Sequence, residues 1–142
     1  MILQSTPVLF VDDIARSEAF FQKLGFERTV GVEEGEGEGA PMGFIIMMQG
    51  GRTDSGLGIM LQTRSSARGD MAGADPAIFD KSGTFLFMSV ADVDAAARAL
   101  EGEEQFLARR DTFYGATEVG FREPGGHYVV LAQLAANSPE EA

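Results

Sequence analysis

The stretch VLFVDDIARSEAFFQKLGFE, residues 8–27, predicts a β-strand that runs directly into an α-helix. The apolar run over residues 6–11 is typical of a strand. Asp12 or Asp13 can then cap a helix, because a carboxylate accepts hydrogen bonds from the free amides of the first helical turn. Gly25 supplies the left-handed residue at which such a helix ends. Together these signals indicate one strand–helix unit near the start of the chain.

The same order of elements occurs a second time along the chain. VDDI at residues 11–14 matches VADV at residues 90–93. There Asp92 can cap a second helix, and Gly102 can end it. A repeat of this length predicts two copies of one β-α-β-β-β unit rather than a solenoid of short repeats. The predicted strands cover residues 6–11, 26–32, 43–49, 57–62, 84–90, 105–109, 116–122 and 128–134.

Two segments lie outside the repeat. EEGEGEG, residues 33–39, contains the pattern G-x-G-x-G, but no helix is predicted after it. A flexible acidic loop is therefore expected there in preference to a phosphate-binding loop. Residues 63–83 join the two units and are long for a plain linker, which predicts a lid or an ordered surface loop.

The composition excludes several classes of function. The chain has no cysteine, which rules out disulfides, thiolate catalysis and thiolate metal sites. A formal net charge of -11 argues against a nucleic-acid surface and fits a modest attraction for cationic ligands. No apolar run is long enough to span a bilayer, and the first residues lack the pattern of a signal peptide. A cytoplasmic protein that binds neither membrane nor nucleic acid is expected.

Residues 8–27 and the stretch FYGATEVGFREPGGHYVVLAQ, residues 113–133, carry a family resemblance. The N-terminal stretch is similar to a strand, an acidic cap and an F-[FY]-x-x-L-G-F segment. The C-terminal stretch is similar to an aromatic-Gly segment, a D-P-x-G-[NH] turn with Glu123 in place of the aspartate, and a last strand. Together they resemble the vicinal oxygen chelate superfamily, the glyoxalase/bleomycin resistance protein/dioxygenase group.

The resemblance covers essentially the whole chain and implies an α+β fold. Residues 1–142 would form a single glyoxalase/bleomycin-resistance-like domain, with modules at about 4–62 and 83–134. The two βαβββ modules would build an open, cup-shaped mixed sheet with the helices on the outside and the ligand inside the cup.

The resemblance also implies four metal-ligand positions, and this chain fills them with Thr6, Met60, Phe85 and Val130. These side chains are poor ligands for a divalent ion, so no metal and no cofactor are expected. His127 is the only histidine and occupies the turn, where such side chains bond locally to the backbone. A structural role is therefore expected for it. An oxygen-only metal site that uses Gln62 and Glu118 is the remaining alternative.

Strand alternation predicts which side chains line the cup. The lining is apolar and aromatic, which favours a flat or apolar small molecule held by a few hydrogen bonds. The alternative is that the same side chains fill the cup as core. The residues expected to contact a ligand are Phe10, Met60, Gln62, Phe85, Phe87, Ser89, Glu118, Tyr128 and Val130.

The function expected from these observations is metal-independent binding or sequestration of a small aromatic or amphipathic molecule, as in bleomycin resistance proteins. The ligand would be cationic or aromatic, the protein a homodimer, and no residue catalytic. The alternative is an enzyme of the same superfamily, a lyase, isomerase or dioxygenase with an off-pattern active site. In that case Glu118, with a pKa raised by an apolar environment, would act as the base. A third possibility is a degenerate member that works only through protein partners.

Overall fold

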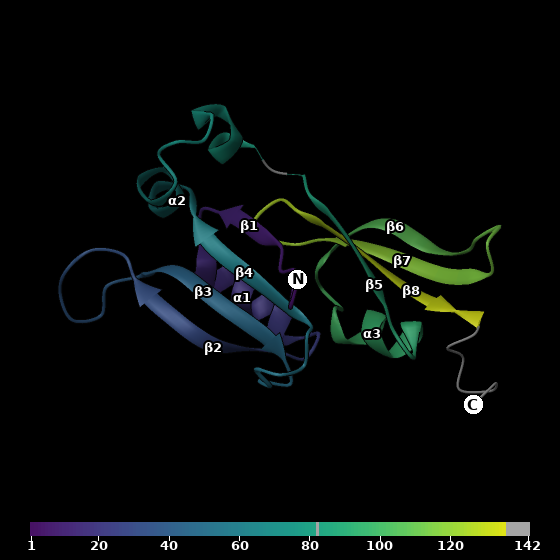
Figure 1. The fold of residues 1–142 in the computed structure, drawn as a ribbon. Coiled ribbons are helices and arrows are strands. Elements are labelled where there is room, and N and C mark those ends of the chain that lie inside the picture. Colours follow the sequence, from purple (N-terminus) through teal and green to yellow (C-terminus); the bar gives the residue numbers. More distant parts are fainter. Residues whose placement is uncertain (82, 136–142) are drawn as a thin grey trace. The chain divides into compact units, whose positions relative to one another are not determined.

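The computed structural model of the chain describes residues 1–81 and 83–135 (Figure 1). The chain divides into two compact units, Met1–Ser82 and Gly83–Ala142. Within the described residues, no helix is long and apolar enough to cross a membrane.

The first unit contains one four-stranded mixed sheet. Its strands lie in the order β1-β4-β3-β2, with β1 parallel to β4 and the other neighbours antiparallel. Helix α1 connects β1 to β2, and two short helices follow β4 (Figure 1). The elements are β1 (Val8–Val11), α1 (Ile14–Gln22), β2 (Phe26–Glu33), β3 (Met42–Gln49), β4 (Gly58–Thr63), α2 (Arg64–Asp70) and the 3₁₀ helix η1 (Pro76–Asp80).

Helix α1 begins and ends where the sequence predicts. Asp13, the second of the two candidates, is the cap, and its carboxylate accepts a hydrogen bond from the backbone N–H of Arg16 at 3.4 Å. Gly25 has a φ of 91°, the left-handed conformation that glycine adopts without a steric penalty. The helix therefore reverses the chain directly into β2.

The two faces of the first sheet differ in burial. One face lies under α1, where Phe20 and Phe21 are fully buried. The other face is apolar but only partly covered, and Val30 and Val32 at its β2 edge are exposed. The buried face is built from Leu9, Val11, Ile45, Met47, Ile59 and Leu61.

The second unit repeats this topology. Its sheet has the order β5-β8-β7-β6, with β5 parallel to β8 and the other neighbours antiparallel. Both units thus have one βαβββ connectivity, and the predicted α+β fold of two such modules is confirmed. The elements are β5 (Phe85–Ser89), α3 (Val93–Ala99), β6 (Glu104–Asp111), β7 (Ala116–Arg122) and β8 (Tyr128–Leu134).

Helix α3 has the two predicted boundary signals. The Asp92 carboxylate accepts from the backbone N–H of Ala95 at 3.0 Å, and Gly102 has a φ of 92°. The helix covers one face of its sheet, where Val129 and Leu131 are fully buried. As in the first unit, one sheet face packs on a helix and the other does not.

The two segments outside the repeat behave differently. The acidic stretch at residues 33–39 connects β2 to β3 without forming a helix, as expected. The connection between the units, by contrast, contains α2 and η1, and neither helix is predicted individually by the sequence. These helices make the connection an ordered surface segment, which is one of the two structures expected for it.

Asp92→Ala is expected to lower the free energy of unfolding by about 1 kcal/mol, because the first turn of α3 loses its side-chain acceptor. Asp92→Asn is the matched control, since an asparagine oxygen also caps and should keep most of the stability. Urea unfolding of the three proteins measures the difference. Equal losses for alanine and asparagine would show that the cap does not act through this hydrogen bond.

Candidate functional site

The turn that holds His127 is organised by Glu123. One oxygen of the Glu123 carboxylate accepts from the backbone N–H of Gly125 at 2.7 Å, and the other accepts from that of His127 at 3.1 Å. The His127 ring is buried, and its Nδ1 accepts from the backbone N–H of Thr84 at 3.3 Å. The histidine thus joins the turn before β8 to the residue before β5. This contact is structural, as expected, but it is made with a distant segment rather than locally within the turn.

The four positions implied for metal ligands lie on or next to the paired strands of each sheet. In the first unit, Met60 lies opposite Val8 in the β1–β4 register, and Thr6 precedes β1. In the second, Phe85 begins β5 and Val130 lies opposite Phe87. Hydroxyl, thioether, aromatic and aliphatic groups are not a ligand set for a divalent ion.

The wider structure does not supply such a set elsewhere. Among residues 1–81 and 83–135, no group of three or more His, Cys, Asp or Glu side chains is placed to hold a metal ion. Gln62 and Glu118, the residues of the oxygen-only alternative, both have side-chain partners of their own. The residues present therefore do not fit the metal centre that the family resemblance implies.

Three of the predicted ligand residues share one face of the first sheet. Phe10 lies directly opposite Gln62 in the register, and Met60 is two residues before Gln62 on the same strand. All three are on the face that α1 does not cover. Gln62 is nonetheless buried, because the segment after β4 packs over this end of the sheet.

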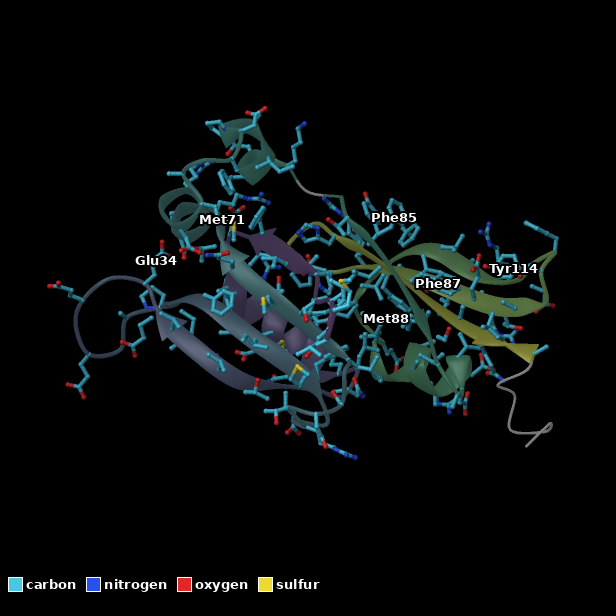
Figure 2. All side chains as sticks on the ribbon, viewed as in Figure 1. Glu34, Met71, Phe85, Phe87, Met88 and Tyr114 are labelled. Carbon is cyan, nitrogen blue, oxygen red and sulfur yellow. The ribbon has the colours of Figure 1, made fainter. Side chains whose placement is uncertain are left out.

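The other six predicted residues share the face of the second sheet that α3 does not cover. Neighbouring strands place Phe85 beside Tyr128 and Phe87 beside Val130. Ser89 and Glu118 both neighbour the same residue of β8, Ala132. Phe85 and Phe87 are 63% and 55% exposed, and Figure 2 shows both side chains on β5.

Three rings on this open face form a cluster, here called the aromatic platform: Phe85, Phe106 and Tyr128. Phe85 and Tyr128 stack at 4.9 Å with an interplanar angle of 13°. Phe106 meets Tyr128 edge-on at 4.9 Å. The guanidinium carbon of Arg122 lies 5.8 Å from the centre of the Tyr128 ring, within the range of a cation–π contact.

Sequence reasoning missed both Phe106 and Arg122. Two register shifts in β6 break its alternation, so the face on which Phe106 lies could not be read from a period of two. The available signal was Gly120, a glycine inside a strand, which often marks the close approach of another group. A Cβ atom at Gly120 would lie 2.6 Å from the Phe106 ring. The missing side chain thus makes room for that ring.

Glu118 lies on the same open face but is almost fully buried, at 3% exposure. Tyr114 donates its hydroxyl hydrogen to one carboxylate oxygen at 2.7 Å. The Arg110 Nε donates to the other oxygen at 2.8 Å. Tyr114 and Arg110 come from the β6–β7 hairpin, and Figure 2 shows Tyr114 near its end. The two donors hold the hairpin against the carboxylate.

The alternative in which Glu118 acts as a base requires a raised pKa, and the contacts of this carboxyl lower its pKa instead. The hydrogen bond from Tyr114, aided by Arg110, holds the pKa of the Glu118 carboxyl below its ordinary value of 4.5, although burial acts in the opposite direction. The same hydrogen bond raises the pKa of the Tyr114 hydroxyl. Glu118 is therefore a satisfied anion at neutral pH, not a base poised to take a proton.

Comparison with known proteins identifies the family of this chain. The family model described as glyoxalase/bleomycin resistance protein/dioxygenase superfamily matches residues 4–131. The chain belongs to this superfamily. A comparison with curated proteins finds no match.

Solved structures of similar fold include other members of this superfamily. A glyoxalase-related enzyme from Clostridium phytofermentans has a TM-score of 0.66 at 14% identity, over 94% of this chain and 96% of the other. A bleomycin resistance determinant encoded on the transposon Tn5 has a TM-score of 0.60 at 20% identity, over 94% and 99%. TioX from Micromonospora sp. ML1 has a TM-score of 0.64 at 15% identity, over 92% and 97%. At these identities the likeness shows the fold alone.

In this superfamily member, Gly120→Ala is expected to destabilise the second unit by about 1–3 kcal/mol, because the new methyl group overpacks against Phe106 and Leu107. Gly69→Ala in α2 is the matched control, since a methyl group added there would meet no heavy atom within 4 Å outside its chain neighbours and the backbone of its own helix. That change should be neutral or slightly stabilising. Thermal unfolding measures both. A Gly120→Ala protein as stable as wild type would remove the packing argument for this glycine.

Glu118→Gln is expected to cost about 1–2 kcal/mol at neutral pH, because two hydrogen bonds to a buried anion lose their charge. The folded pKa lies below the unfolded one, so this stabilisation is present above the unfolded value and disappears as pH falls through the folded value. The difference between variant and wild type should therefore shrink in acid. Urea unfolding across this range measures it.

Glu104→Gln is the control for that experiment. Glu104 pairs with Arg122 at 3.5 Å, and both side chains are largely exposed. Its removal should cost less than about 0.5 kcal/mol. Equal pH dependence of the two variants would contradict a special role for the buried carboxylate.

Proposed function

We propose that the protein binds a small aromatic or amphipathic molecule without a metal, and that the open face of the second sheet is its main contact surface. The observation that carries the proposal is the aromatic platform, together with Phe87 beside it. Phe85, Phe87 and Phe106 remain 63%, 55% and 40% exposed. Exposed rings gathered on one sheet face mark a binding surface more often than exposed single side chains do.

The chemistry of this face suits a flat ligand. Ring faces and edges are both available, so an aromatic group can stack on one ring and meet another edge-on. Two polar groups on this face could orient such a molecule. One is the ion pair of Glu118 with Arg110, and the other is Arg122 beside Tyr128. A net charge of -11 supports a cationic or neutral aromatic ligand over an anionic one.

The absence of a competent ligand set at Thr6, Met60, Phe85 and Val130 supports metal-independent binding rather than the chemistry of metal-using relatives. The fold shared with a bleomycin resistance determinant supports sequestration as the biological use. The proposal includes a homodimer that acts in the cytoplasm. Sedimentation of the purified protein tests the dimer, and a monomer would remove that part.

Phe87→Ala tests the binding surface. Loss of one stacking ring is expected to weaken binding of bleomycin or of the neutral fluorescent probe 2-naphthol by about tenfold. Phe113→Ala is the matched control, because Phe113 is a fully exposed phenylalanine in the β6–β7 loop, outside the platform. Titration followed by fluorescence or calorimetry gives the dissociation constants.

Equal weakening by the two variants would point to adsorption on any exposed ring. No measurable binding of any aromatic ligand in a broad thermal-shift screen would overturn the proposal. In that case the rings would serve packing alone.

A further inference from the structure

The open face of the first sheet is covered at one end by the segment that follows β4. The ring of Phe79 from η1 lies 5.3 Å from the ring of Phe10 at an angle of 60°. Phe79 is 2% exposed, so Phe10 and its neighbours shield it from solvent. One phenylalanine thus occupies the place on Phe10 that an aromatic ligand ring would take.

A polar contact accompanies the ring contact. Gln62, directly opposite Phe10 in the register, donates its side-chain N–H to the hydroxyl of Ser66 at 3.2 Å. The covering segment therefore offers this end of the sheet one aromatic ring and one hydroxyl. An aromatic molecule that carries a hydroxyl or amide group would offer the same two contacts.

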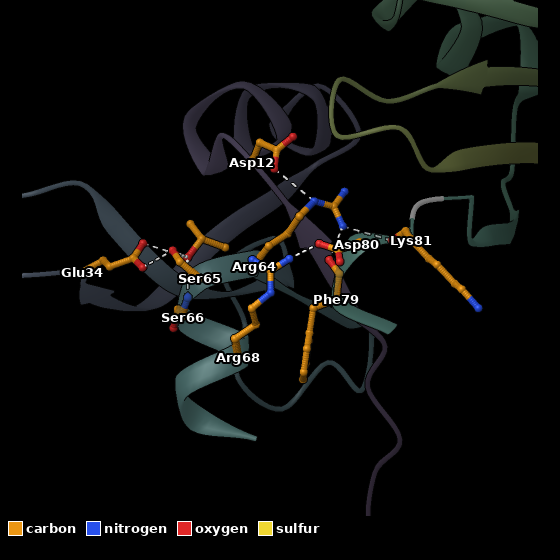
Figure 3. Close-up of polar contacts among 10 residues, drawn as sticks. Asp12, Glu34, Arg64, Ser65, Ser66, Arg68, Phe79, Asp80 and Lys81 are labelled. Carbon is orange, nitrogen blue, oxygen red and sulfur yellow. Dashed lines mark hydrogen bonds and ion pairs between the residues drawn. The ribbon is translucent and has the colours of Figure 1, made fainter. Parts of the chain in front are cut away.

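Arginine side chains hold the cover in place (Figure 3). Arg64 Nη1 donates to the carbonyl oxygens of Phe79 at 2.6 Å and Lys81 at 3.1 Å, while its Nε donates to Asp12 at 3.0 Å. Arg68 pairs with Asp80. Arg64 thus connects α2, the chain around η1 and the end of β1.

Little apolar surface secures the same segment. Within α2 and η1, only Ala67 and Phe79 are buried. Met71 and Ile78 remain exposed. The Arg68–Asp80 ion pair is exposed and contributes little stability, so the half-buried Arg64 is the main polar contact that holds the segment. Segments with few buried apolar contacts open at low free-energy cost. The cover can therefore lift without unfolding the sheet beneath it.

Within residues 83–135, no helical segment of the second unit covers its sheet in the same way. The repeat aligns Val11 with Val90, so the β5 residues Phe87 and Ser89 correspond to Val8 and Phe10 of β1. Ser89 is exposed, whereas Phe10, its counterpart on β1, is half-buried and contacts Phe79. One of two equivalent faces is thus closed by a segment that the other does not have.

We infer that the first sheet carries a second site for a hydroxyl- or amide-bearing aromatic group, built on Phe10 and Gln62, and that Phe79 fills it until a ligand displaces the ring. Arg64 is the latch that holds the segment closed. The inference rests on the proposed function, because Phe10 and Gln62 are contacts of the same proposed ligand class. The inference adds a second binding site on the first sheet, and it makes Phe79 an internal competitor for the ligand.

Phe79→Ala tests the site, with 2-naphthol, a neutral aromatic molecule that carries a hydroxyl group, as the probe. Removing the internal competitor should tighten probe binding by about tenfold. Ile78→Ala is the matched control, since Ile78 neighbours Phe79 on η1 but is exposed. Adding Phe10→Ala to Phe79→Ala should abolish the gain. A folded Phe79→Ala protein with unchanged or weaker affinity, or a gain that survives loss of Phe10, overturns the inference.

Arg64→Met provides a test that does not depend on the Phe79→Ala protein folding. It keeps the aliphatic stem and removes the donors, so amide hydrogen exchange over residues 64–81 should become faster and probe binding tighter. Unchanged amide hydrogen exchange and unchanged probe affinity would show that Arg64 does not hold the segment closed. If probe binding depends on Phe87 but is changed by neither Phe79→Ala nor Arg64→Met, the inferred second site is overturned and the proposed function is not. Absence of binding by every variant overturns the proposed function with it.

Discussion

The alternation of side chains along each strand is the constraint that shapes both sheets of this protein. Because successive residues point to opposite faces, each sheet has one face that packs on its helix and one that does not. Leu9 and Leu61 lie under α1, while their neighbours Phe10 and Met60 face the other way. A shift of one residue in register would exchange the core for the candidate site.

The same constraint explains why the candidate site is apolar without being core. Phe85, Phe87 and Val130 occupy one face of a sheet whose other face already supplies the buried contacts of α3. At two of these positions metal-using relatives would be expected to carry ligands. Here an aromatic ring and an isopropyl group stand there, and neither is a metal ligand.

Much of the fold could be predicted from sequence because its signals are local. Asp92 and Gly102 mark a helix through their own hydrogen bond and backbone conformation. The position of Phe106 could not be predicted, because bulges in β6 disrupt the period. A lid or an ordered surface loop is predicted for residues 63–83, but the contact between Phe79 and Phe10 is not, since α2 and η1 are too short to show a period. The pKa of Glu118 depends on Tyr114 and Arg110, whose approach is set by the hairpin.

Ligand binding without a metal ion is the property that would set this chain apart from metal-using members of its superfamily. It is tested by the dissociation constant of an aromatic ligand, determined after dialysis against chelator and again with excess divalent transition metal. Metal content of the same samples is measured in parallel. We expect equal dissociation constants and no stoichiometric metal in protein purified without chelator. A stoichiometric metal whose removal abolishes binding would contradict metal-independent binding.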